Sequence, residues 1–351
     1  MRRLVYILPI LIAVAVVDQW LTDDRSIGWE RNSVRNSLDR WENRTHSRFA
    51  IMGSSTSKDW LPGRYLESLF QLKRGQVVDA HINGCHQGCT WSSVRRMLQR
   101  HRMKRCRWKG PNRCEPTKKK RFDAVFFGTN LFQMCEDGHS KRVLQHQSLL
   151  PTQDIGRLFK IYASAKRPLE HIGRYLGMAL SGAYGDTRAI RDYWSTKFLG
   201  RGPASSEYRW YRARPESTQH EILSCDYEAE NVALKLAFTA ALLDDLKDLS
   251  EMTYLMLLPD QSRALKEPLH QQRWAAHIAA HEKLVSRRPW VKLLDLSAPD
   301  FIRAHHFKDG FHLKRSAYKE QQQRLRNALD AQGALPPKKA KEPATKQKVN
   351  K

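Results

Sequence analysis

Five short apolar segments recur along the chain and predict a buried sheet. Each has the length of a β-strand and is almost continuously apolar, which is typical of parallel strands covered on both faces. They are Phe49–Met52, Val77–Ile82, Phe122–Phe127, Thr253–Leu258 and Trp290–Leu296. Segments with helical periodicity alternate with them: Leu61–Leu72, Ser92–Met103, Tyr227–Leu249, Gln271–Val285 and Leu313–Leu329. This alternation predicts an α/β fold in three layers, flavodoxin-like, with a parallel sheet in the order 2-1-3-4-5.

One interval is too long for a single crossover helix. About 125 residues separate the third and fourth predicted strands, far more than one connection needs. We expect a helical insertion at about residues 140–225, in which Ile155–Leu180 is amphipathic. The α/β domain as a whole is predicted over residues 47–333. Residues 334–351 are rich in Lys, Pro and Ala without apolar periodicity, which predicts a disordered basic tail.

The N-terminus has the pattern of an export signal. Two arginines precede Leu4–Val17, which carries no charge but is shorter than the roughly 20 residues that span a bilayer. Ala13-Val14-Ala15 resembles a cleavage site, whereas Trp20 and Leu21 extend the segment into an uncleaved anchor, which we favour. Residues 1–21 are thus predicted to be a signal anchor or a signal peptide, and residues 22–46 a helical spacer; a buried core helix is the remaining alternative. Either export reading places the domain outside the cytoplasm, in the periplasm or on the cell surface, or secreted if cleaved.

The charge is strongly positive and unevenly distributed. Lys and Arg number 61 against 36 Asp and Glu, a formal net charge of +25 over 351 residues. Most of the excess lies in Arg95–Arg121 and in Pro337–Lys351. Two interpretations of these segments remain open: contact with an anionic polymer or with anionic lipid headgroups, or a solvated helix face and a solvated tail, which we favour. No specific nucleic-acid-binding motif is present, and 41% hydrophobic residues exclude a wholly disordered chain.

Cysteine usage agrees with an oxidising compartment. The even number permits up to three disulfides. The cysteines are Cys85, Cys89, Cys106, Cys114, Cys135 and Cys225. Cys85-x3-Cys89 alone is a weak match to a zinc knuckle, and Cys106 and Cys114 flank a Gly-Pro-Asn turn. Disulfides and free buried thiols both remain open, and the pairing is not determined by the sequence.

Glycine and polar residues follow the predicted strands. These motifs are Gly53-Ser54-Ser55, Asn83-Gly84-Cys85-His86-Gln87-Gly88, Gly128-Thr129-Asn130 and Asp309-Gly310-Phe311-His312. In a parallel α/β sheet, ligands bind beyond the carboxyl ends of the strands where the strand order reverses. For the order 2-1-3-4-5 that point lies between strands 1 and 3, so Ser55 and Asn130 should face each other.

The residue types in these motifs suit acyl transfer. A serine such as Ser55 becomes nucleophilic when a histidine accepts its proton, and a carboxylate fixes the tautomer of that histidine. Asp309 and His312, three residues apart in one loop, supply the latter two groups. The backbone N–H groups of Ser55 and Gly88 and the side-chain amide of Asn130 are candidates for an oxyanion hole. We expect glycine at position 88 so that the backbone approaches the substrate without a Cβ atom.

Each motif in isolation has an ordinary structural explanation. Thr56, Ser57 or Asp59 suit a helix N-terminus, and Asp309-Gly310 suits a turn. The catalytic interpretation therefore depends on the four motifs occurring together, in order, each after its strand.

Taken in order, the motifs resemble the four blocks of the SGNH (GDSL-type) hydrolase superfamily. The resemblance covers roughly residues 48–130 and 253–330, and the Gly-Ser-Ser variant is similar to the membrane-anchored branch that includes the D-alanyl transfer protein of teichoic acid modification. It implies Ser55, His312 and Asp309 as a catalytic triad. Two positions depart from the family pattern: Cys85 replaces the middle glycine of the second block, and Leu131 replaces an aspartate in the third.

The resemblance also implies an activity. It is that of an exported serine esterase or O-acyltransferase acting on ester-linked acyl groups of a cell-envelope glycan or polyol polymer. We expect an acylated carbohydrate or polyol as substrate, no metal or organic cofactor, and a membrane-bound acyltransferase as a further partner. The alternative is a catalytically inactive relative that binds an envelope glycan, a polyanion or such an acyltransferase.

Overall fold

The computed structural model describes residues 40–41, 44, 46–82, 85–107, 120–134, 152–165, 227–298 and 302–336. The predicted anchor at residues 1–21 lies outside these residues, as do most of the spacer, most of the insertion and most of the basic tail. Within the insertion, η3 (Thr152–Asp154) and the helix α8 (Ile155–Ser164) are described. No helix in the described part of the chain is both long and apolar enough to span a bilayer.

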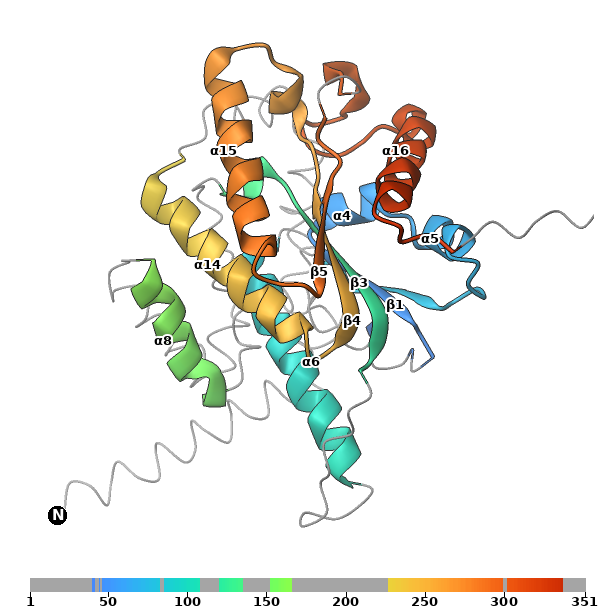
Figure 1. The fold of residues 1–351 in the computed structure, drawn as a ribbon, viewed down its shortest axis with the longest axis vertical. Helices are drawn as coiled ribbons and strands as arrows, with labels where there is room; N and C mark the ends of the chain where they lie inside the picture. Colours follow the sequence, from blue (N-terminus) through green and yellow to red (C-terminus); the bar gives the residue numbers. More distant parts are fainter. Residues whose placement is uncertain are drawn as a thin grey trace, which may run out of the picture.

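The protein is an α/β domain built on one parallel five-stranded sheet (Figure 1). The strands are β1 (Phe49–Gly53), β2 (Val77–Asp79), β3 (Phe122–Thr129), β4 (Ser250–Leu257) and β5 (Val291–Asp295). Their order is β2-β1-β3-β4-β5, which confirms the predicted fold class and strand order. Gly53 at the end of β1 is paired with Gly128 in β3, so the loops after these two strands leave the same edge of the sheet.

Alternate residues of the strands enter two separate apolar cores. In β1, Ala50 and Met52 belong to one core, while Phe49 and Ile51 belong to the other. The first core lies under α6 (Gln87–Arg107), α14 (Ala229–Leu246) and α8. The second lies under α4 (Ser55–Trp60), α5 (Gly63–Leu69) and α16 (Tyr318–Ala331). Because helices cover both faces (Figure 1), the strands are apolar along most of their length, with polar residues mainly at their ends.

Several element boundaries differ from the sequence prediction. β2 ends at Asp79 rather than Ile82. The predicted helix 61–72 is preceded by the short helix α4, and α5 begins only after Pro62, which occupies its N-cap. The last helix begins at Tyr318 rather than Leu313, because Leu313 pairs with Phe307 in an antiparallel bridge. Apolar periodicity continued into this bridge and therefore placed the helix start too early.

The basic segment Arg95–Arg121 is partly structural. Arg95 is buried, and its guanidinium donates to the carboxylates of Asp154 and Asp245, which joins α6 to η3 and α14. Burial alone would lower the pKa of Arg95, but these two carboxylates outweigh it and raise the pKa. At the other end, Arg121 lies over the Phe122 ring and donates to the carbonyl oxygen of Ser47.

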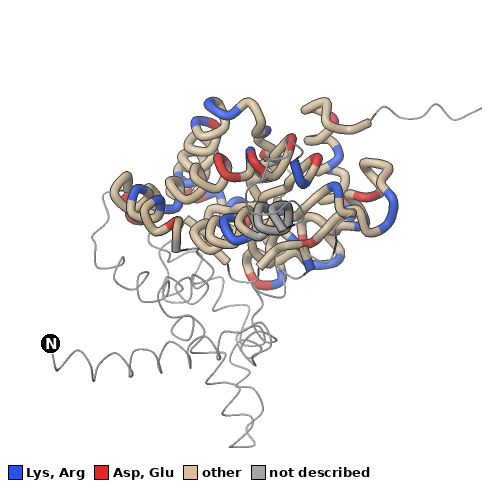
Figure 2. The backbone as a smooth tube through the Cα atoms, turned by 90° about the horizontal axis from the view of Figure 1, so that it is seen from below, with Lys and Arg blue, Asp and Glu red and all other residues tan. Residues whose placement is uncertain are grey.

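Neither end of this segment is a freely solvated face. In the view of Figure 2, Lys and Arg residues of the described domain are interspersed with Asp and Glu. The predicted contact of this segment with an anionic polymer stays a prediction, since residues 108–119 lie outside the described part.

A row of buried polar side chains lies along α15 (Pro268–Val285). His277 and His281 are buried beside each other, with ring centroids 4.3 Å apart. His281 Nδ1 is hydrogen-bonded to the carbonyl oxygen of His277, whereas the Nε2 atoms of both rings have no partner within the described residues. Burial lowers the pKa of His281 to about 4. Burial also lowers the pKa of His277 well below its usual value, and the neighbouring His281 ring adds to this effect. Both rings are therefore neutral in the folded protein.

This pair predicts an acid-sensitive fold. Below pH 6.5 the unfolded chain takes up protons at these histidines while the folded protein does not, so the free energy of unfolding must fall as pH falls from 6.5 towards 4. His277→Leu should reduce this slope by about 1.4 kcal/mol per pH unit, the contribution of one proton. Urea unfolding at pH 4.5, 5.5, 6.5 and 7.5 measures it. An unchanged slope in the variant would contradict the explanation.

Candidate active site

The turn after β1 is sharp and depends on two glycines. Gly53 has a φ of +121°, a conformation that side chains disfavour, and a Cβ atom there would lie 2.6 Å from the carbonyl oxygen of Gly128. A Cβ atom on Gly128 would lie 2.7 Å from Leu258 Cδ1 and would also meet Ser57 Oγ. Ser57 thus packs between the ends of β1 and β3. Its place brings the first turn of α4, and with it Ser55, onto the edge of the sheet.

Three of the predicted site residues lie in contact, in series. Ser55 Oγ is 2.9 Å from His312 Nε2, and His312 Nδ1 is 2.7 Å from Asp309 Oδ2. His312 is buried, whereas Ser55 and Asp309 are partly exposed. With a proton on Nδ1 donated to the carboxylate, Nε2 is the acceptor for the hydroxyl proton of Ser55. This is the arrangement that activates a serine for attack on a carbonyl carbon.

The loop that carries Asp309 and His312 is held at both ends. The Phe307–Leu313 bridge closes it, and Gly310 takes a φ of +89° at its tip. Asp309 Oδ1 accepts the backbone N–H of His312 at 2.9 Å. Burial alone would raise the pKa of Asp309, but hydrogen bonding and charge interaction with His312 outweigh it and hold the pKa below its usual value. Asp309 is therefore a carboxylate at neutral pH and fixes the orientation of the imidazole.

Asn130 lies buried at the end of β3, on the same edge as Ser55. Its Oδ1 atom accepts the backbone N–H of Gln133 at 3.0 Å. The amide group is thereby oriented, and its Nδ2 atom has no hydrogen-bond partner within the described residues. An oriented amide with unused N–H donors suits the role of an oxyanion donor. The predicted role of Asn130 stays a prediction.

A buried hydrogen-bond network that the sequence analysis did not identify lies beneath this edge. Gln133 Nε2 donates to Ser54 Oγ at 2.7 Å, and Gln133 Oε1 accepts from Thr129 Oγ1 at 3.0 Å. Gln87 Nε2 donates to Thr129 Oγ1 at 2.9 Å. The network joins the residue before Ser55 to the loops after β2 and β3. The sequence gives only a weak sign of this network: Gln87 lies within the second strand-end motif, and Gln133 lies three residues after the third.

The second motif has a packing role besides the one expected. Gly88 lies in the first turn of α6, where backbone N–H groups have no partner within the helix. A Cβ atom at Gly88 would meet the Phe238 ring at 3.3 Å. Glycine here allows α6 to pack on α14, and the expected approach of a substrate to this backbone stays a prediction. Cys85 and Cys89 form a disulfide around this turn, which resolves the alternative between bonded and free thiols for this pair.

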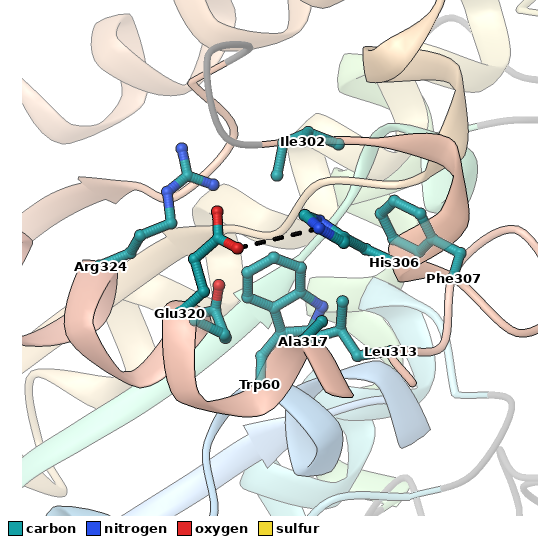
Figure 3. Close-up of a pocket in the computed structure, with 9 residues that line it drawn as sticks. Trp60, Ile302, His306, Phe307, Leu313, Ala317, Glu320 and Arg324 are labelled. Atoms are coloured by element: carbon teal, nitrogen blue, oxygen red, sulfur yellow. Dashed lines mark ion pairs between the residues drawn. The ribbon is translucent and has the colours of Figure 1, made fainter. Parts of the chain in front are cut away.

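A small pocket lies beside the loop that carries Asp309 and His312 (Figure 3). It is lined by Trp60, Ile302, His306, Phe307, Leu313, Ala317, Glu320, Gln321 and Arg324. Trp60 Nε1 and Gln321 Nε2 are buried there without partners in the described structure. The pocket has room for about one water molecule, which such donors suit. Ser55, His312 and Asp309 are not among the residues that line it.

No group of three or more His, Cys, Asp or Glu side chains in the described part of the chain is arranged to hold a metal ion. No protein-family model and no curated protein matches the chain. The chain is similar to a solved structure described as "a putative platelet activating factor from Streptococcus pneumonia", at 12% identity and a TM-score of 0.35. The match covers 91% of this chain and 99% of the other. A similarity of this size does not establish a function for this chain.

The packing around Ser57 predicts that Gly128→Ala is damaging. The new methyl group must displace Ser57, and therefore α4 and Ser55, at a cost of about 1–3 kcal/mol in the free energy of unfolding. We expect urea denaturation to show this loss. We also expect the rate at which Ser55 reacts with a fluorophosphonate probe to fall at least tenfold. Gly156→Ala in α8 is the matched control, since nothing lies within 4 Å of its Cβ position. Equal behaviour of the two variants would show that the close approach is unimportant.

Proposed function

We propose that this protein is an SGNH-type serine esterase or O-acyltransferase acting on ester-linked acyl groups. The observation that carries the proposal is the unbroken series Ser55 Oγ–His312 Nε2 and His312 Nδ1–Asp309 Oδ2, at 2.9 and 2.7 Å. Serine, histidine and carboxylate meet from loops 257 residues apart in the chain. A turn former and a helix cap do not require that convergence, whereas nucleophilic catalysis does.

The proposed reaction has two steps. In the first, Ser55 Oγ attacks the ester carbonyl carbon while His312 Nε2 accepts the hydroxyl proton. The C–O bond to the alcohol then breaks, and His312 returns the proton to the leaving oxygen, so that the acyl group is bound to Ser55. In the second step, water or a sugar or polyol hydroxyl loses its proton to His312 and attacks the acyl carbon. The bond between the acyl carbon and Ser55 Oγ then breaks, and His312 returns the proton to Ser55 Oγ. Water gives hydrolysis and a hydroxyl group gives transfer.

The negative charge on the carbonyl oxygen needs fixed donors. We assign this role to Asn130 Nδ2 and to the backbone N–H groups of Ser55 and Gly88. The support for Asn130 is its oriented amide, whose oxygen is already engaged by the Gln133 N–H. Donors fixed before the reaction stabilise the transition state without reorganising.

The substrate class and location complete the proposal. We propose an acylated carbohydrate or polyol of the cell envelope as substrate, reached by a domain outside the cytoplasm and tethered by residues 1–21. The support is the charge pattern of the N-terminal sequence and the resemblance of the four motifs. On this proposal, a membrane-bound acyltransferase supplies the acyl groups, and the Lys-rich tail contacts anionic lipid or polymer.

A fluorophosphonate probe tests the nucleophile. It should label the wild-type protein covalently, and Ser55→Ala should abolish the labelling, because the probe reacts only with an activated hydroxyl. His312→Ala should slow labelling at least a hundredfold. In-gel fluorescence and mass spectrometry of the modified peptide measure both effects.

Ser286→Ala, which removes a serine at the end of α15, is the control and should label like the wild type. Absence of labelling in folded wild-type protein would contradict the proposal and favour the inactive, glycan-binding alternative. Labelling that survives Ser55→Ala would show that another residue is the nucleophile.

Asn130→Ala tests the oxyanion hole. Removing one such donor should lower kcat for p-nitrophenyl acetate by about 100- to 1,000-fold, with KM nearly unchanged, because the donor acts on charge that develops in the transition state. Steady-state kinetics measure the two constants separately. A change confined to KM would assign Asn130 to substrate binding instead.

A further inference from the structure

The loop after β4 contains a carboxylate that the proposed reaction does not use. Asp260 is completely buried. Its Oδ1 atom accepts the backbone N–H of Ser262 at 3.0 Å and also the Ser262 hydroxyl. Its Oδ2 atom accepts the backbone N–H of Phe132 at 3.1 Å. One carboxylate thus joins its own loop to the loop that follows β3 and carries Asn130.

The same loop is also bonded to the loop of Asp309 and His312. The backbone N–H of Gln261 donates to the carbonyl oxygen of Gly310 at 2.6 Å. The rings of Phe132 and Phe311 stack with centroids 5.5 Å apart and an interplanar angle of 10°. The β4 loop therefore contacts both the oxyanion loop and the loop with the histidine, and these two loops touch each other through the stacked rings.

From these contacts we propose that Asp260 is a positioning residue. It fixes the position of the Asn130 loop and of the Asp309–His312 loop relative to Ser55. The inference rests on the proposed esterase function and deepens it. Asp260 touches none of the three aligned side chains in the described structure. It acts through the Phe132 backbone and through Gln261, its neighbour in the chain.

Burying the charged carboxylate of Asp260 costs free energy, which supports a specific role for it. Burial raises the pKa of Asp260 to about 6, although hydrogen bonds from Ser262 and Phe132 partly offset it. A buried charge is unfavourable, and a neutral side chain would make the local turn at lower cost. An ionised acceptor, however, bonds an N–H about twice as strongly as a neutral one. That strength is useful where a loop must be fixed within a few tenths of an ångström.

The next strand provides a matched comparison. Asp295, at the end of β5, makes the same turn: its Oδ1 atom accepts the N–H and the hydroxyl of Ser297, at 2.7 and 2.5 Å. Asp295 is exposed, and in the described structure it bonds to neither the Asn130 loop nor the Asp309–His312 loop. Two aspartates therefore share one local structure, and Asp260 alone of the two is bonded to an active-site loop.

The test compares Asp260→Asn, Asp260→Ser and Asp295→Asn in the full chain. The serine variant keeps a hydroxyl that can accept the N–H of Ser262 but is too short to reach Phe132. We expect both Asp260 variants to melt cooperatively and to lose ten- to a hundredfold in kcat for p-nitrophenyl acetate, with KM changed less than threefold. Backbone amide hydrogen exchange should become faster in residues 130–134 and 307–313. Asp295→Asn should match the wild type in kcat and in exchange of these peptides.

The proposal would be overturned if the Asp260 variants fold and match the wild type in kcat and in hydrogen exchange. It would also be overturned if both Asp260 variants unfold, because Asp260 would then stabilise the fold as a whole. Equal losses in Asp295→Asn would also overturn it, since the effect would belong to the turn. Failure of the wild type to react with the fluorophosphonate or the ester would instead overturn the proposed function. Hydrogen exchange would then still decide whether Asp260 holds the two loops.

Discussion

The proposed reaction depends on one hydrogen bond, between Ser55 Oγ and His312 Nε2. It joins residues 257 positions apart, and its strength depends steeply on distance and angle. Both loops must therefore be fixed to the same sheet. The close approach of Ser57 to Gly128 fixes one of them, and the bridge between Phe307 and Leu313 fixes the other.

The sheet was predictable because burial leaves a plain record in the sequence. A strand covered on both faces, such as β3 with its buried Val125 and Phe126, is apolar over nearly its whole length. The contact of Ser55, His312 and Asp309 was predictable for a related reason. Parallel strands bring their carboxyl ends to one edge, so motifs that follow strands are bound to lie near one another.

Features that depend on a distant partner were not predictable. Arg95 lies in a run of basic residues and has the appearance of a solvated position, because its partners Asp154 and Asp245 are 59 and 150 residues away. Asp260 looks like an ordinary turn former, as Asp295 is. Its burial and its contact with Phe132, 128 residues away, distinguish it from Asp295. The local pattern of apolar and polar residues indicates which positions are buried. It does not indicate which distant group a polar side chain contacts.

The disulfide between Cys85 and Cys89 has a consequence for the backbone turn that it closes. Its two cysteines are only four positions apart, so it restricts the unfolded chain, and stabilises the fold, less than a disulfide that closes a long loop would. What it does constrain is the direction in which the backbone around Gly88 enters α6. A thiol reductant would thus leave the domain folded while it releases the turn that leads into α6. On the proposed function, in which the Gly88 N–H is an oxyanion donor, reduction would lower activity before it lowers stability.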